Sequence, residues 1–357
     1  MARPSRQNAA ARDFILRNVR AHPANIAAVT AARYGLSRPA VAGYLKRLID
    51  EGLIDATGTT SDRRYKARDL ISVDFDVRLT IGLSEDAVWR GQLLSHIRDH
   101  LPENVLNICE YGFTEMLNNA IDHSASFNAH ITYRQSYGHV RIEVIDYGIG
   151  IFQKLQNRFN LTDPRQALLE LSKGRLTSDP QHHTGHGIFF TSRMFDDFNI
   201  FSGNLYYSRT KQDDDDWCVE ARDLKEPVIG TWVNMIISTN ASWTTREIFD
   251  KYQDDPVGFT RTHVPIALGK YPGEQLVSRS QAKRVLARVD RFSEVLLDFQ
   301  GVQDIGPAFA DEIFRVFKNS HPDISIVAAR ANVGVARMIK AAQIAPAGET
   351  VGQSRSL

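Results

Sequence analysis

The segment EYGFTEMLNNAIDHS, residues 110–124, decides the fold of the central part of this chain. Glu115, Asn119 and Asp122 follow one another at helical spacing and therefore share one face of a predicted helix. An amide oxygen on that face can ligate magnesium, and a carboxylate one turn away can orient or deprotonate water or a hydroxyl. By itself, this spacing is usual among solvated polar residues. Apolar residues at the same period predict the buried stripe of the helix, formed by Cys109, Phe113, Met116, Leu117, Ala120 and Ile121.

A second motif, RIEVIDYGIGI at residues 141–151, combines a strand with a glycine-rich turn. Apolar and polar residues alternate up to Asp146, which predicts a strand, and Gly148 and Gly150 follow directly. The glycines allow the backbone to approach a ligand closely. The carboxylate of Asp146 can accept a hydrogen bond from an adenine amino group. Taken alone, Asp-x-Gly-x-Gly is also a common turn.

A third motif, HHTGHGIFFTSRMF at residues 182–195, places Gly185 and Gly187 before a helix that we expect from Ile188. Backbone N–H groups at the start of a helix form an anion site that suits a phosphate group. A glycine-rich turn before a helix is also common without any ligand.

The order and spacing of these motifs resemble the N, G1 and G2 boxes of the GHKL (Bergerat-fold) superfamily, which includes gyrase-type ATPases, chaperone ATPases and histidine kinases. The segment GTWVNMII, residues 230–237, resembles the closing strand, so the resemblance spans about residues 80–240. It implies that ATP and Mg²⁺ are the cofactors, with Asn119 as the magnesium ligand and Asp146 as the adenine contact. The nucleotide-binding residues that we expect are Asn119, Asp122, Asp146, Gly148, Gly150, Lys173, Gly185, His186, Gly187 and Thr231.

By the same resemblance, the segment Phe152–Thr184 corresponds to the ATP lid. Either Lys173 or Arg175 could contact phosphate, and solvated lid charges are the alternative. Within the superfamily, EMLNNAIDHS resembles most closely the anti-sigma-factor serine kinases, which also carry Glu at the position of Glu115. This resemblance makes Glu115 the candidate catalytic base. The phosphorylated histidine box of sensor kinases is not evident upstream, so a sensor histidine kinase is not expected.

Residues 8–70 are predicted to form three helices followed by a hairpin. Ser37 can cap the third helix, Pro39 suits its first turn, and Gly35 precedes both in the turn. Residues 1–70 contain 13 Lys/Arg and 6 Asp/Glu, so their local charge is +7, whereas the whole chain carries +1. Such a basic segment points to an anionic partner. The apolar face of the third helix consists of Val41, Tyr44, Leu45, Leu48 and Ile49.

The run LSRPAVAGYLKRLIDEGLI, residues 36–54, resembles the winged helix-turn-helix domains of bacterial regulators. In such domains a helix enters the major groove and basic wing residues meet phosphates. The resemblance therefore implies DNA as a partner, and the alternative is a winged helix that makes only protein contacts. The expected DNA-binding residues are Arg38, Lys46, Arg47, Arg63 and Arg64.

Near the C-terminus, EVLLDFQGVQDIGPAFADEIFRVF (residues 294–317) resembles the STAS domains of anti-anti-sigma factors. Those domains follow a buried strand with a helix start that bears a phosphoacceptor serine. Here Pro307 and Ala308 lie where the serine is expected, and no Ser or Thr lies between Ser293 and Ser320. Phosphorylation within the chain is therefore doubtful, and we expect a docking or signal-receiving module.

The length of 357 residues and a hydrophobic content of 43% predict a globular chain of several domains. The expected fold class is multidomain α+β, with a winged helix, a Bergerat α/β sandwich and a small STAS-like α/β domain. The expected boundaries are a winged helix at 1–70, an ATP-binding domain at 71–245, a linker at 246–273, a STAS-like domain at 274–345 and a disordered tail at 346–357.

No apolar run approaches the ~18–20 residues of a membrane span, and two cysteines without paired spacing exclude a disulfide framework or zinc cluster. We therefore expect a cytoplasmic protein without a membrane partner. The leading hypothesis is a transcription regulator in which a GHKL nucleotide domain modulates a DNA-binding domain. The rivals are a serine/threonine kinase of the anti-sigma type and an interaction protein with a structural nucleotide. Glu115 favours catalysis, while a protein partner of the STAS-like domain and a homodimer stay open.

Overall fold

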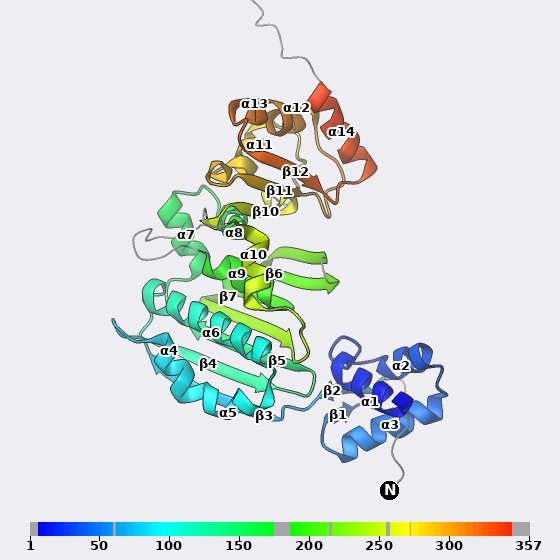
Figure 1. The fold of residues 1–357 in the computed structure, drawn as a ribbon. Helices are drawn as coiled ribbons and strands as arrows, with labels where there is room; N and C mark the ends of the chain where they lie inside the picture. The colour runs from blue at the N-terminus through cyan, green and yellow to red at the C-terminus, as the bar shows by residue number, and fades with distance from the viewer. Residues whose placement is uncertain are drawn as a thin grey trace, which may run out of the picture. The chain divides into compact units, whose positions relative to one another are not determined.

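The computed structural model describes residues 6–59, 62–174, 186–213, 216–254, 258–271 and 273–344. These residues form several separate sheets with helices between them, which confirms the multidomain α+β fold class (Figure 1). The chain divides into two compact units. Unit 1 consists of Met1–Ile151, Phe190–Trp217 and Arg222–Ile248, and unit 2 consists of Phe152–Phe189, Cys218–Ala221 and Phe249–Leu357. In the described ranges, no helix is both long and apolar enough to cross a membrane.

Unit 1 begins with the N-terminal module, residues 6–67, which has the predicted three helices and antiparallel hairpin. Ser37 caps the third helix as expected, because its Oγ accepts a hydrogen bond from the backbone N of Ala40 at 3.4 Å. The predicted apolar face is buried except for Ile49, which is partly buried against the same core. The elements are α1 (Arg6–Asn18), α2 (Ile26–Tyr34), α3 (Arg38–Asp50), β1 (Ile54–Thr57) and β2 (Arg64–Ala67).

The rest of unit 1 is built on a five-stranded sheet of order β3-β4-β5-β7-β6, in which β3, β4, β5 and β7 pair antiparallel. Helix α6 (Glu103–His123) lies over one face of this sheet (Figure 1) and packs against β5. The predicted stripe of α6 is buried except for Ile121, which is partly exposed. The strands are β3 (Ile71–Arg78), β4 (Asn128–Gln135), β5 (His139–Asp146), β6 (Asp197–Asp213) and β7 (Asp216–Ser238).

Shorter helices complete the layer that holds α6. The indole of Trp89 is fully buried and lies 5.4 Å from the ring of Phe113, which fixes the segment before α6 against the helix. These elements are α4 (Glu85–Val88), a π-helix (Trp89–Leu94), α5 (Ser95–Ile97) and a 3₁₀ turn (Arg98–His100). Two further helices, α9 (Gly187–Met194) and α10 (Thr245–Tyr252), each cross the boundary between the two units.

Unit 2 contains a parallel three-stranded sheet of order β10-β11-β12. Its helices include α7 and α8, which precede the sheet by many residues in the sequence. The elements are α7 (Ile151–Phe159), α8 (Arg165–Lys173), β8 (Gln253–Asp254), β9 (Gly258–Phe259), β10 (Arg261–Pro265), a 3₁₀ turn (Ile266–Gly269), α11 (Arg279–Leu286), a second 3₁₀ turn (Val289–Arg291), β11 (Glu294–Asp298), α12 (Pro307–Asp311), a π-helix (Glu312–Phe317), α13 (Lys318–Ser320), β12 (Ser325–Ala329) and α14 (Val333–Ile344).

One expected boundary needs correction, and another falls outside the described residues. The segment 246–273, predicted as a linker, contains β10, whose Thr262 and Val264 are buried because the strand pairs with β11. The described part of the segment Phe152–Phe189, predicted inside the ATP-binding domain, makes its contacts within unit 2. The tail predicted at 346–357 lies outside the described residues.

Candidate nucleotide site

Helix α6 carries Glu115, Asn119 and Asp122 along one side, as the spacing predicts. Asp122 is exposed, whereas Glu115 and Asn119 are partly buried. Burial raises the pKa of the Glu115 carboxyl, the negative charge of Glu85 adds to this effect, and a hydrogen bond with Tyr111 opposes it. A partly buried carboxylate with a raised pKa binds a proton more readily than an ordinary carboxylate, which makes Glu115 a candidate proton acceptor.

Asn119 has an amide that the fold itself does not use. Its Nδ2 atom is buried and has no hydrogen-bond partner among the described residues. An unsatisfied buried amide is costly for a protein and is uncommon. A ligand beside α6 would remove that cost, and Mg²⁺ is typically held by only one or two protein groups together with substrate phosphates and water. The Nδ2 of Asn119 is an N–H donor and therefore fits an acceptor such as a phosphate oxygen of a nucleotide, while the amide oxygen Oδ1 of the same side chain is the atom that would hold Mg²⁺.

Asp146 ends β5 and lies opposite Thr231 of β7 in the sheet register. Its side chain is buried, and its Oδ1 accepts a hydrogen bond from the backbone N of Gly148 at 2.9 Å. Burial raises the pKa of Asp146, and hydrogen bonds from Gly148 and Thr231 only partly offset this. The Oγ1 of Thr231 also accepts from the backbone N of Ile151 at 3.0 Å. The structure thus brings together Asp146, Gly148 and Thr231.

Glycine is required at Gly148 and Gly230 for a different reason from the close approach of a ligand that the sequence suggests. A Cβ at Gly148 would overlap the backbone carbonyl of Ser124 at the end of α6, and a Cβ at Gly230 would overlap the carbonyl of Asp146. Gly230 also has φ of +73°, which favours glycine. The close approach is therefore made by the chain's own backbone. Its effect is to hold the end of α6 and the end of β5 against an interior position of β7, around Asp146.

The third motif is only partly described. Gly185 lies outside the described residues, together with Arg175, His182 and His183. Gly187 begins α9 and His186 precedes it, with the imidazole ring 4.5 Å from the ring of Phe259. His186, Gly187 and Phe259 belong to unit 2, whereas Asn119, Asp146 and Thr231 belong to unit 1.

Lys173 does not offer a free ammonium to a phosphate. It is 1% exposed, and its Nζ donates to Glu170 Oε1 at 2.8 Å and to the carbonyl oxygen of Ala287 at 2.7 Å. Burial lowers the pKa of the Lys173 ammonium, and the charge of Glu170 opposes this. These contacts argue against the expected phosphate contact, because the ammonium is already paired within unit 2.

The basic residues of the N-terminal module are at its surface. The five expected DNA-binding residues, three on α3 and two at the hairpin, are all exposed. The guanidinium of Arg47 lies 4.8 Å from the Tyr44 ring centroid, and that of Arg63 lies 5.6 Å from the Tyr65 ring centroid. Aromatic rings therefore support two of these cations without neutralising their charge.

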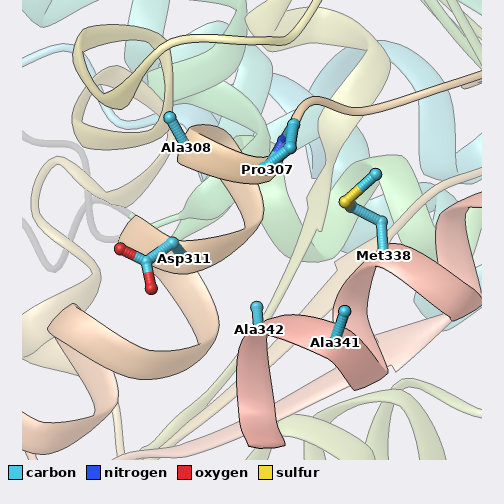
Figure 2. Close-up of a pocket in the computed structure, with 6 residues that line it drawn as sticks. All are labelled: Pro307, Ala308, Asp311, Met338, Ala341 and Ala342. Atoms are coloured by element: carbon cyan, nitrogen blue, oxygen red, sulfur yellow. The ribbon is translucent and has the colours of Figure 1, made fainter. Parts of the chain in front are cut away.

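At the loop where a phosphoacceptor serine was expected, the STAS-like region has a cavity of about 320 Å³ (Figure 2). Pro307 and Ala308 start α12 on one side of it, with Asp311 one turn further on. The cavity thus has mainly apolar walls and one carboxylate, and none of the residues that line it carries a hydroxyl. The lining residues are Pro307, Ala308, Asp311, Met338, Ala341 and Ala342.

Sequence reasoning missed the residues that tune Glu115 and Asp146. Tyr111 lies one turn before Glu115 on the same face of α6, so the helical period could have identified it. Glu85 lies on α4 and Ser124 follows the last turn of α6, and no local pattern predicts their approach to the site.

Comparison with protein families agrees with this geometry for two parts of the chain. Residues 87–206 match the family described as a histidine kinase-like ATPase domain. Residues 281–336 match the family described as a STAS-like domain of unknown function (DUF4325). Neither match covers the N-terminal module, and no curated protein matches the chain. The chain therefore contains a histidine-kinase-like ATPase domain, with the nucleotide-binding site that such a domain implies, and a STAS-like domain.

Proposed function

We propose that this chain is an ATP-binding transcription regulator in which the nucleotide site modulates DNA binding by the N-terminal module. The observation that carries this proposal is the contact of α1 with the turn between β4 and β5. Tyr137 in that turn donates its hydroxyl to Asp13 Oδ1 at 3.0 Å, and the Arg17 guanidinium lies 5.3 Å from the Tyr137 ring centroid. Arg17 also donates to Thr239 Oγ1 at 3.3 Å.

The docked turn leads directly to the candidate nucleotide site. A Cβ at Gly138 would lie 2.9 Å from the Cα of Arg17, so α1 and the turn touch through their backbones. Strand β5 begins at the next residue, His139, and ends at Asp146. A change at Asp146 can therefore reach α1 along one strand, through contacts that have little room to yield.

In this proposal Asp146 and Thr231 bind the adenine base, and Asn119 holds Mg²⁺. The magnesium ion would neutralise phosphate charge when bound. The basic residues of α3 and the hairpin meet DNA phosphates and base edges. Their exposure and the local charge of +7 support this role.

The test is the DNA affinity of the full chain at fixed salt with no nucleotide, with ADP and with a non-hydrolysable ATP analogue. Allosteric couplings are typically ~1–3 kcal/mol, so we expect a change of ~5–150-fold between nucleotide states. By linkage, DNA must change the affinity for the analogue by the same factor. Equal DNA affinities in all three states would show that the modules are merely tethered.

The DNA contact has its own test. Replacing Arg63 and Arg64 by Gln should weaken binding to all sequences and lower the salt slope of log K by up to ~0.9 per lost phosphate contact. Arg33→Gln on α2 is the matched control, since it removes an exposed cation of the same module outside α3 and the hairpin. An affinity that does not depend on salt would favour a protein-contact role for this module.

A second candidate function is ATP hydrolysis or phosphotransfer, as in the anti-sigma-type kinases. The observation that favours it is the partly buried Glu115 carboxyl, one turn from Asn119 on α6, with a raised pKa. As a base, Glu115 would take the proton of a water or hydroxyl whose oxygen attacks the γ-phosphorus, while the bond to the β,γ-bridging oxygen breaks and ADP leaves. Glu115→Gln should then keep ATP binding and lower turnover by ~10²–10⁴-fold. ATP binding without turnover by the wild type would favour a structural nucleotide.

A further inference from the structure

Helices α7 and α8 lie inside the segment that matches the ATPase family, residues 87–206, yet they belong to unit 2 with the STAS-like domain. Helix α8 packs against β10 and against the 3₁₀ turn Ile266–Gly269. All of its residues from Ala167 to Lys173 are buried, including Glu170 and Lys173. A helix that is buried on all sides is a core element, so α8 is an integral part of unit 2.

Charged contacts hold α8 to the residues around α11. Lys173 donates to Glu170 and to the carbonyl of Ala287, as described above, and Arg288 NH1 lies 2.9 Å from the second carboxylate oxygen of Glu170. The Oγ1 of Thr262 in β10 donates to the carbonyl of Lys173 at 2.6 Å. Glu170 is therefore paired with two cations, one on each side of this contact.

Arg288 is held in an unusual backbone conformation at this contact. Its φ is +60°, which is uncommon for a residue with a side chain. Its guanidinium lies 4.3 Å from the Phe159 ring centroid at the end of α7 and also pairs with Glu170. One residue of the STAS-like region thus contacts both α7 and α8.

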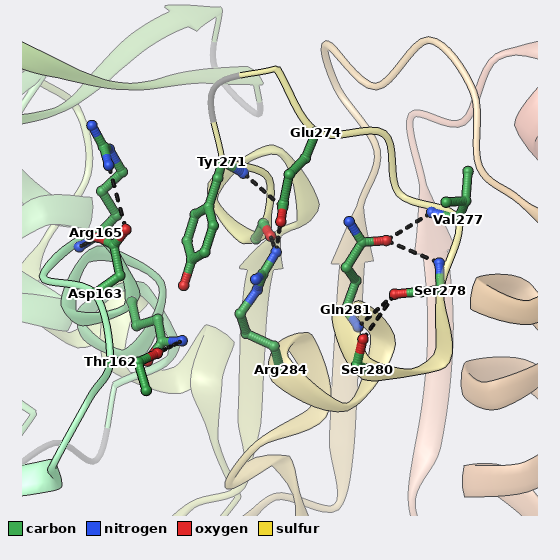
Figure 3. A network of polar contacts seen from close by, with 12 residues as sticks. Thr162, Asp163, Arg165, Tyr271, Glu274, Val277, Ser278, Ser280, Gln281 and Arg284 are labelled. Carbon is green, nitrogen blue, oxygen red and sulfur yellow. Dashed lines mark hydrogen bonds and ion pairs between the residues drawn. The ribbon is translucent and has the colours of Figure 1, made fainter.

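The loop between α7 and α8 also meets this region. Figure 3 shows Thr162, Asp163 and Arg165 next to Tyr271 and Arg284. The charge of Asp163 contributes to the raised pKa of Tyr271, whose main cause is burial. Arg284 donates to Glu274 Oε2 and to the carbonyl of Gly269, both at 2.6 Å.

We propose that the α7–α8 pair is the resident partner of the STAS-like domain, which thereby controls nucleotide affinity. This inference rests on the proposed function. Helices α7 and α8 precede the third motif in the sequence, and unit 2 contains them together with His186 and Gly187 of that motif. A signal that loosens α8 from the STAS-like domain would therefore alter the unit that holds these two residues.

The experiment compares Arg288→Ala and Glu170→Gln with a matched control in the full chain. The control is Lys283→Ala, which removes an exposed cation of α11 that pairs with Glu312. Calorimetry gives the ATP affinity, and hydrogen exchange of residues 165–173 reports how firmly α8 is held. We expect faster exchange in both test variants, a change in ATP affinity of ~5–150-fold, and wild-type values in the control.

The outcomes separate this inference from the proposed function. If the wild type binds ATP and faster exchange in either variant leaves the ATP affinity unchanged, the inference is overturned while the proposed function stands. If exchange of α8 is unchanged in both variants, Arg288 and Glu170 do not hold α8, and the inference is again overturned. A wild type that binds no ATP overturns the proposed function itself.

Discussion

Two buried aspartates at strand ends, Asp146 in unit 1 and Asp298 in unit 2, have opposite surroundings. Asp298 ends β11 and is 2% exposed. It pairs with the guanidinium of Arg330, whose Nε lies 2.9 Å from Oδ1, and hydrogen-bonds with His263 Nε2 at 2.8 Å. Burial by itself would raise the pKa of Asp298, but the hydrogen bonds from His263 and Arg330 outweigh it and hold the pKa well below its usual range.

Asp146 is almost as deeply buried, but no ion pair to it occurs in the described part of the chain. Only neutral donors reach it, from Gly148 and Thr231, and its pKa is raised. A buried carboxylate that is paired with cations has its charge balanced within the fold. A buried carboxylate that meets only neutral donors can still accept a hydrogen bond from a ligand. The contrast favours a structural role for Asp298 and supports the binding role that the proposed function gives to Asp146.

The largest expected effect is on the stability of unit 2. Asp298→Asn removes the negative partner of Arg330, and breaking a buried pair typically costs ~3–5 kcal/mol. We expect about 3 kcal/mol, the lower end, because the Arg330 side chain keeps 29% of its exposure. Hydrogen exchange of β11 and β12 measures this, because all four tryptophans lie in unit 1 and their fluorescence reports that unit only. Unchanged hydrogen exchange would show that Asp298 does not stabilise unit 2.

Asp146→Asn should lower the affinity for ATP rather than the stability of the fold. Hydrogen bonds to a charged group contribute ~1.5–3 kcal/mol, so the variant should bind ATP about ten- to a hundredfold more weakly. Its stability by tryptophan fluorescence should be unchanged or slightly higher, because a buried charge is removed. A loss of stability with normal ATP affinity would reverse the roles of the two aspartates.

The two carboxyls should also give opposite pH dependences. The pKa of Asp298 is depressed in the folded state, so its contribution is present above the unfolded pKa of ~3.9 and is lost as pH falls below that value. The pKa of Asp146 is raised, so its ionisation weakens the fold as pH rises above ~3.9. Each slope is at most ~1.4 kcal/mol per pH unit. Denaturation from pH 3 to 7 should show each slope disappear in the corresponding Asn variant, and slopes of the same sign would contradict this account.

The smallest expected effect concerns His139, at the turn on which α1 docks. Burial lowers its pKa to about 4, with the charges of Arg20 and Arg17 adding to this effect. The folded pKa lies below the unfolded value of ~6.5, so this contribution to stability is present above pH ~6.5 and is lost as pH falls towards 4. Between pH 7 and 6 the loss should be less than ~1 kcal/mol. In urea unfolding followed by fluorescence, the His139→Gln variant should not lose stability between pH 7 and 6. If the variant still loses stability over this range, another group is responsible.

The features that were predicted from the sequence are those that depend on residues close to one another in the chain. Five of the six residues that the helical period predicted for the stripe of α6 are buried, and Ser37 caps α3 as predicted. The alternation before Asp146 predicted β5, since that strand has one face against a helix layer. These features depend on residues close in sequence, which is why they could be derived without the fold.

The errors came from partners that are distant in sequence. Lys173 was assigned to phosphate because its partner Ala287 lies far along the chain, although its pairing with Glu170 three residues away was visible as a local pattern. Strand β10 was hidden in a predicted linker because Pro265 suggested a break. Pro265 is the last residue of that short strand, where a missing N–H costs little.

The central claim is that Asp146 and Asn119 belong to a site for magnesium–ATP, and calorimetric titration of the folded full chain with ATP tests it most directly. We predict saturable binding that weakens when magnesium is chelated and that weakens about ten- to a hundredfold in Asp146→Asn. The matched variant Asp76→Asn, at an exposed position of β3 in the same sheet, should bind like the wild type. Absence of ATP binding by the folded wild type, or equal affinities in Asp146→Asn and Asp76→Asn, would contradict the claim.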